Sequence, residues 1–77
     1  MEKYYVLRKN EYYLSDIMVE DGKLVNFTVD TEYRKLYADN ELAHLNQRII
    51  FIETGLNFDL NKLNHYQHIF FYILYQQ

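Results

Sequence analysis

Apolar and polar residues alternate over much of the first thirty positions, a pattern that predicts β-strands. Two short pairs interrupt the alternation, Lys9-Asn10 and Asp21-Gly22, and each contains a residue that tolerates the positive φ of a two-residue hairpin turn. The pattern therefore predicts a three-stranded antiparallel meander, with strands in "YYVLR", "EYYLSDIMV" and "KLVNFTV".

The two turns also predict which residues lie opposite one another. Three cross-strand pairs of opposite charge follow: Arg8 with Glu11, Lys3 with Asp16, and Glu20 with Lys23. One sheet face is predicted to carry Tyr5, Leu7, Tyr12, Leu14, Met18, Val25, Phe27 and Val29, and the other Tyr4, Val6, Tyr13, Ile17, Val19 and Leu24. Because both faces are substantially apolar, each is expected to have a cover.

The middle of the chain predicts one of these covers. A short helix can start at "DTEYRKLY", with Asp30 or Thr31 as its cap. A second helix follows in "ADNELAHLNQR", capped by Asp39 or Asn40 and carrying an apolar stripe of Leu42, Leu45 and Ile49. The segment "RIIFIE" then predicts a fourth strand, which ends at Thr54-Gly55.

The last segment predicts the second cover. Leu56, Leu60, Leu63, Tyr66, Phe70 and Ile73 recur at helical spacing, and Asn57 or Asp59 can cap the helix. From Ile69 onward the segment is apolar on all sides, as expected of a helix contacted from more than one direction. Because the run Ile69–Tyr75 has strong β propensity, a terminal strand is the alternative. The run is too short to cross a bilayer, which needs about 20 apolar residues. We expect the tail to pack on the second sheet face and to contact a partner or a second copy.

Together these elements predict one α+β domain over residues 1–77: an antiparallel meander of three strands, a fourth strand, one connecting helix and a C-terminal helix. The chain has no cysteine, which excludes a disulfide framework and agrees with a reducing cytoplasm. No secretory signal is apparent in "MEKYYVLRKNEYYL". The expected location is therefore the cytoplasm.

Residues that could carry chemistry are few. His65 and His68 stand three apart, His44 precedes them, and Glu53 or Asp59 could complete a metal site, but no recognised metal motif is present. Ser15 is the single serine and lies within a predicted strand, and two glycines cannot build a phosphate loop. We therefore expect no enzyme activity, no cofactor and no bound metal.

Charge and aromatic content favour protein binding. Residues 11–32 hold six acidic residues against one lysine, and the acids left unpaired by the predicted register continue beyond that stretch. These acids can be ordinary solvated residues, or they can meet a basic groove on another protein. Tyrosine and phenylalanine make up 18% of the chain, and surplus tyrosine is common at interfaces. The predicted partner-binding residues are Asp21, Asp30, Glu32, Asp39, Glu41, Tyr66, Phe70, Tyr72 and Tyr75.

The stretches "KYYVLRKNEYYL" and "NFTVDTEYRKLYADNELAHLNQRIIFIE" resemble small accessory proteins encoded by phages and prophages of low-GC Gram-positive bacteria. Phe27-Thr28, Asp30–Tyr37 and Glu41–Ala43 carry the resemblance, which covers residues 3–53. The chain departs from that pattern at Tyr33, where a small residue is usual, and residues 56–77 lie outside it. The resemblance implies a phage accessory product, and such products commonly bind and inhibit a host protein, as anti-CRISPR proteins do.

Three functions are therefore carried forward as hypotheses. The first is a stoichiometric inhibitor of a host defence or nucleic-acid-processing protein. The second is a structural homo-oligomer, with a possible homodimer through the C-terminal segment. The third is a weak single-stranded nucleic-acid-binding module, which the absence of a basic face disfavours.

Overall fold

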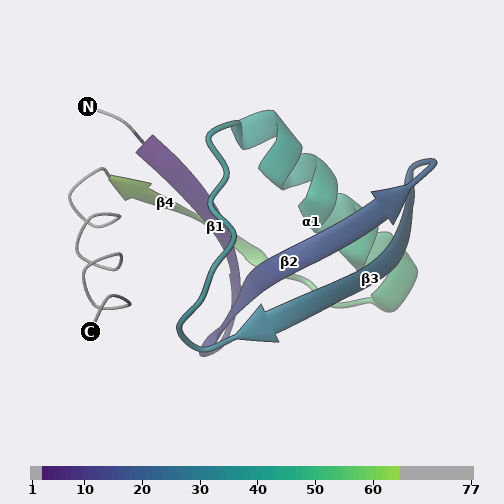
Figure 1. The fold of residues 1–77 in the computed structure, drawn as a ribbon, viewed down its shortest axis with the longest axis horizontal. Helices are drawn as coiled ribbons and strands as arrows, with labels where there is room; N and C mark the ends of the chain where they lie inside the picture. The colour runs from purple at the N-terminus through teal and green to yellow at the C-terminus, as the bar shows by residue number, and fades with distance from the viewer. Residues whose placement is uncertain (1–2, 65–77) are drawn as a thin grey trace.

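The computed structural model describes residues 3–64, which form a four-stranded antiparallel sheet and one helix (Figure 1). The elements are β1 Lys3–Lys9, β2 Tyr12–Glu20, β3 Lys23–Asp30, α1 Asn40–Thr54 and β4 Asp59–Asn64. The strand order is β3-β2-β1-β4, so β3 and β4 are the sheet edges. This is the predicted α+β class, although two of its elements occupy other residues than predicted.

The two hairpin turns differ in how closely they match the prediction. Asp21 and Gly22 both have positive φ, 52° and 75°, and Glu20 pairs with Lys23 as predicted. In the first hairpin, however, Arg8 pairs with Tyr13, and the turn consists of residues 10–11. The predicted Arg8–Glu11 pair is therefore wrong, because Asn10, with φ of 56°, takes the first turn position.

The predicted pairing of Lys3 with Asp16 is also wrong, because Lys3 pairs with Asn64 of β4. Strands β1 and β2 pair only at Arg8 and Lys9 and separate beyond them.

Two irregularities in the pairing of β2 with β3 change the predicted sheet faces. The register shifts between Leu14 and Asp16 and again between Met18 and Val19. Each shift reverses the alternation of side chains, so that Ile17 and Leu24 pack against the core instead of facing away. Met18 and Val25, predicted to face the core, are 55% and 53% exposed.

The connection between β3 and α1 fills the gap where β1 and β2 separate. Tyr37 exchanges backbone hydrogen bonds of 2.8 and 2.9 Å with Tyr5, and the Lys35 amide donates to the Leu14 carbonyl at 2.8 Å. The predicted short helix from Asp30 is therefore wrong, since residues 31–39 contain no helical turn and Tyr37 forms a β-bridge with Tyr5. Extended backbone is needed here because the separated strands would otherwise leave backbone groups without partners.

The core lies between the sheet and α1. Its buried members are Leu7, Leu14, Tyr37, Ala43, Ile50 and Phe58. The Tyr37 hydroxyl donates a 2.6 Å hydrogen bond to Oδ1 of Asn46, which is also buried. Burial raises the pKa of Tyr37, and the negative charge of Asp16 adds to the rise.

Helix α1 begins as predicted and continues further than predicted. Oδ1 of Asp39 accepts a 2.9 Å hydrogen bond from the Glu41 amide, which makes Asp39 the N-cap. The predicted strand "RIIFIE" is wrong, because these residues are helical through Thr54. The helix ends at Gly55, whose φ of 80° and 2.9 Å hydrogen bond to the Phe51 carbonyl form a left-handed C-cap.

The fourth strand lies later in the chain, at Asp59–Asn64, and pairs with β1 along its whole length. The predicted C-terminal helix is therefore wrong for these six residues. As a strand, they give hydrogen-bond partners to the backbone groups along the edge of β1, and they place Leu60 against the core. The remainder of that prediction, residues 65–77 with Tyr66, Phe70, Tyr72 and Tyr75, lies outside the described residues.

Candidate protein-binding surface on helix α1

The five acids predicted to bind a partner lie in three separate places. Asp21 is in the β2–β3 turn and Asp30 is at the other end of β3, about 25 Å away for a strand of eight residues. Glu32 follows Asp30, whereas Asp39 and Glu41 are at the start of α1. The structure therefore does not gather these residues into one acidic surface.

Two of these carboxylates also make local backbone contacts. Oδ2 of Asp30 accepts hydrogen bonds from the amides of Glu32 at 2.8 Å and Tyr33 at 2.7 Å. The bond from Tyr33, and then that from Glu32, lowers the pKa of Asp30. Asp39 caps α1. Asp30 and Asp39 therefore shape the ends of the β3–α1 connection, whatever else they contact.

Helix α1 carries two adjacent apolar stripes, and the larger one faces away from the sheet. Ala43 and Ile50 are fully buried, and Asn46 joins them on the inward side. The second stripe, which we call the outer stripe, consists of Leu42, Leu45, Ile49 and Ile52. Leu42 is 45% exposed, Leu45 53% and Ile52 70%. This spacing of three and four residues places the outer stripe along one flank of the helix.

The predicted role of Leu42, Leu45 and Ile49 as the cover of the sheet is therefore wrong. The inward positions go to Ala43, whose small side chain permits close helix packing, and to Asn46, which is the hydrogen-bond partner of Tyr37. A leucine in place of Asn46 would leave the buried Tyr37 hydroxyl without this acceptor. The polar pair thus selects the face of α1 that contacts the sheet.

Two hydrogen bonds on opposite flanks hold α1 in this rotation. The Glu53 carboxylate accepts from the Leu24 amide of β3, and Nε2 of Gln47 donates to the Phe58 carbonyl at 2.6 Å. Turning the outer stripe toward the sheet would break both contacts and the Tyr37–Asn46 bond. The exposure of the outer stripe is therefore a property of the fold.

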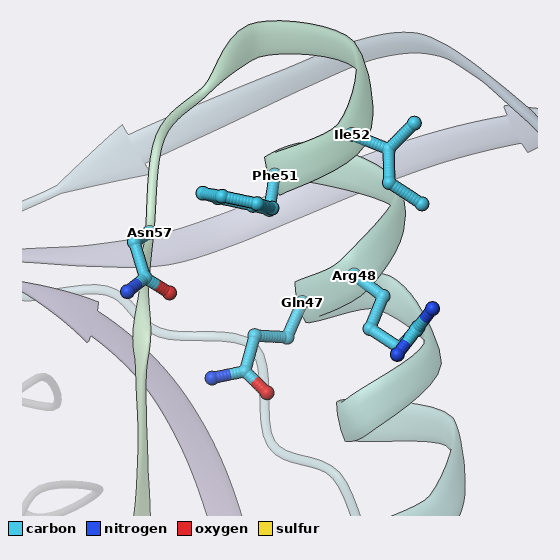
Figure 2. Close-up of a pocket in the computed structure, with 5 residues that line it drawn as sticks. All are labelled: Gln47, Arg48, Phe51, Ile52 and Asn57. Atoms are coloured by element: carbon cyan, nitrogen blue, oxygen red, sulfur yellow. The ribbon is translucent and has the colours of Figure 1, made fainter.

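A hollow of about 350 Å³ lies beside the outer stripe at the carboxyl end of α1 (Figure 2). Its lining residues are Gln47, Arg48, Phe51, Ile52 and Asn57. Figure 2 shows Phe51 and Gln47 extending toward the connection that carries Asn57, while Arg48 and Ile52 point to the other side of the helix. Phe51 is 52% exposed. Phe51 therefore lies on the flank of α1 toward Asn57, and Arg48 separates it from the outer stripe.

Tyrosine 13 forms a second surface feature, on β2. The Arg34 guanidinium lies 3.7 Å from the centre of its ring and that of Arg8 lies 5.6 Å away. Cation–π contacts of this kind hold exposed side chains in place. Tyr13 therefore has a structural reason for its position, and we do not assign it to the binding surface.

No metal site forms among residues 3–64, since no three histidine or acidic side chains there lie together. Nδ1 of His44 is 3.1 Å from the Gln47 side-chain oxygen, while Glu53 contacts Leu24. His65 and His68 lie outside the described residues. Within the described part of the chain, no helix is long and apolar enough to cross a bilayer.

Comparison with known proteins gives no further guide: no family model, curated protein or solved structure matches the chain. Function is therefore inferred from the surface itself. Sequence patterns predicted Leu42, Leu45 and Ile49 as inward residues and missed Phe51 and Ile52, which were placed in a strand. Extending the helix to Gly55 would have revealed the complete stripe at positions 42, 45, 49 and 52.

Proposed function

We propose that this chain acts by binding another protein in a fixed ratio, and that the outer stripe of α1 is its contact surface. The observation that supports the proposal is the exposure of Leu42, Leu45 and Ile52, between 45% and 70%, on a helix held in a fixed rotation. Small proteins rarely expose a contiguous apolar surface without a partner for it.

The size of this surface is consistent with a specific contact. Full burial of a leucine, isoleucine or phenylalanine side chain contributes about 1.5–3 kcal/mol. Covering the exposed parts of these three side chains would contribute roughly 3–4 kcal/mol, from which the cost of association must be subtracted. Polar contacts at the edge are therefore needed as well.

Charged residues at the edges of the stripe can supply those contacts. Asp39 and Glu41 lie at the amino end of α1, and Arg48 lies near its carboxyl end. This arrangement favours a partner with basic residues opposite the first turn and an acidic residue opposite Arg48.

We further propose that the partner is a host defence or nucleic-acid-processing protein and that binding inhibits it. The resemblance of residues 3–53 to phage and prophage accessory proteins supports this part. A cytoplasmic location and the absence of catalytic activity belong to the same proposal.

Self-assembly is the second candidate function, and the spacing of the outer stripe supports it. Residues at intervals of three and four are also the pattern by which two helices pack together. However, an antiparallel pair of α1 helices that buried all four residues of the outer stripe would place Arg48 beside Arg48 of the second copy. Two like charges side by side would destabilise such a dimer. The hetero-complex is therefore preferred.

The test is affinity capture from a Gram-positive host lysate that expresses its defence systems. The variant Leu45→Gln with Ile52→Gln is compared with the control Met18→Gln with Val25→Thr, which changes equally exposed apolar residues away from α1. We expect the unmodified chain and the control to retain one host protein in a fixed ratio, and the α1 variant to lose it. Equal retention by both variants would contradict the proposed surface.

A further inference from the structure

A second hollow has a lining of different chemistry from the hollow beside the outer stripe. It measures about 360 Å³ and is lined by Lys9, Asn10, Tyr12, Phe27, Val29, Leu56 and Phe58. These residues come from the β1–β2 hairpin, from β3, and from the connection that leads from α1 back to β4 (Figure 1). Three segments distant in sequence thus meet around one space.

The interior of this hollow is aromatic and apolar. Phe58 is 2% exposed, and its ring meets that of Phe27 edge to face, with 6.2 Å between the ring centres and 89° between the planes. Tyr12, Val29 and Leu56 form the rim and are 43%, 41% and 37% exposed. A flat aromatic or short alkyl group can therefore contact a ring below and apolar side chains around it.

Side-chain hydrogen bonds hold the hairpin and the connection in place, and pairing with β2 holds β3. The Arg8 Nε donates to the Asn10 carbonyl at 2.6 Å in the hairpin, and Gln47 donates to the Phe58 carbonyl at 2.6 Å. The Leu56 amide donates to the Thr54 hydroxyl at 3.1 Å. Because the walls are fixed in advance, a small molecule would not have to order them on binding.

Charge defines the rest of the ligand. Lys9 is the one charged residue among the lining residues, and the Asn10 amide beside it can also donate a hydrogen bond. A single ammonium matches a monoanion, whereas a phosphate dianion would call for several donors or an arginine. The volume is at the lower end of that of small-molecule sites, about 300–1,000 Å³, which limits the apolar part to about one ring or a short chain.

We infer that this hollow is a binding site for small carboxylates with an aryl or short alkyl group, with the carboxylate at Lys9 and the apolar part over Phe27 and Phe58. The site goes beyond the proposed function and shares no lining residue with the hollow beside the outer stripe. Loss of either function would therefore leave the other to be tested.

The test uses 3-phenylpropionate and its neutral counterpart 3-phenylpropionamide as probes in ¹⁵N–¹H NMR titrations of the full chain at pH 7. For a probe of this size we expect saturable binding in the low millimolar range. Amide shifts should centre on Lys9, Asn10, Tyr12, Phe27, Val29, Leu56 and Phe58. An exposed ion pair changes a dissociation constant by a factor of about two to five. The carboxylate should therefore bind about two to five times more tightly than the amide.

Two variants separate charge from shape. Lys9→Gln should abolish the preference for the carboxylate, whereas Lys23→Gln, at the exposed start of β3, should keep it. Leu56→Ala should weaken both probes alike. A preference for the carboxylate that persists in Lys9→Gln would overturn the inference, and so would amide shifts that centre on other residues. The absence of a saturable shift in the full chain would overturn it too, including the case in which residues 65–77 or a second copy fill the hollow.

Discussion

Two isoleucines on the same helix give the most direct test of how α1 is oriented. Ile50 is fully buried and Ile52, two residues later, is 70% exposed. In a strand, residues two apart lie on the same face and would be buried alike. In the helix they lie about 200° apart, so the same substitution should have different costs.

The magnitudes follow from the exposures. A buried methylene is worth about 0.8 kcal/mol, and removing it from a packed core adds a cavity term, so Ile50→Val should cost about 1–1.5 kcal/mol. Ile52 has about a third of its surface buried, so Ile52→Val should cost roughly 0.3 kcal/mol. Valine is the better probe, because Ile50→Ala, at about 2–5 kcal/mol, could remove much of the stability of so small a domain.

The assay is urea unfolding at 25 °C followed by far-ultraviolet circular dichroism. With a slope near 1 kcal/mol per molar urea, the Ile50→Val midpoint should fall by about 1–1.5 M and that of Ile52→Val by about 0.3 M. Both slopes should equal that of the unmodified chain. Equal losses at the two positions would refute the helical assignment of residues 48–53, and a larger loss at Ile52 would refute the rotation of α1.

Further predictions concern the polar core pair, the connection and the helix end. Tyr37→Phe should lower the free energy of unfolding by about 1–3 kcal/mol, because the buried side-chain oxygen of Asn46 loses its donor. Adding Asn46→Leu should recover part of this loss, and full additivity of the two losses would contradict the hydrogen bond between Tyr37 and Asn46. The folded-state pKa of Tyr37 is raised, so protonated Tyr37 should contribute fully to the free energy of unfolding below its unfolded pKa near 10, and this contribution should be lost as pH rises above that value. Unfolding measured from pH 8 to 11 should therefore show a smaller alkaline loss of stability in Tyr37→Phe. The pKa of Asp30 is lowered, so its carboxylate stabilises the fold above its unfolded pKa near 3.8, and this stabilisation is lost as pH falls further. Unfolding measured from pH 6 to 2 should therefore show a smaller loss of stability in Asp30→Asn than in the unmodified chain. An unchanged pH profile would count against the hydrogen bonds from the Glu32 and Tyr33 amides to Asp30. Gly55→Ala should cost about 1–2 kcal/mol through its φ of 80° alone, because nothing lies within 4 Å of an added Cβ, and a neutral result by thermal unfolding would exclude the left-handed cap.

Local signals in the sequence predicted the parts of the fold that local chemistry decides. Asp21-Gly22 marks its turn because both residues tolerate positive φ, and Asp39 marks the start of α1 because its carboxylate accepts the Glu41 amide. Gly55 marks the end of the helix for the same kind of reason. Each signal depends on residues no more than four positions apart.

The errors arose where distant contacts decide. Residues 48–53 are rich in β-branched side chains and favour a strand by propensity, yet Ile50 fills the core only when the helix continues. The extended connection at Tyr37 depends on the separation of β1 from β2, which no local pattern reveals. The shifts beside Leu14 and Met18 in β2 likewise depend on how β2 meets β3.

The candidate surface was hidden for a related reason. Leu42, Leu45 and Ile49 form the more apolar stripe of α1, and periodicity alone places such a stripe inward. The contacts of Tyr37 with Asn46 and of Leu24 with Glu53 reverse that choice. Both contacts join residues far enough apart that only the folded arrangement brings them together.

The most direct test of the central claim is a quantitative affinity capture with the two matched double variants. We expect Leu45→Gln with Ile52→Gln to unfold at nearly the same urea concentration as the unmodified chain and no longer to retain the host partner. Met18→Gln with Val25→Thr should keep both its stability and the partner. Retention of the partner at an unchanged ratio by the folded α1 variant would contradict the claim that the outer stripe of α1 is the binding surface.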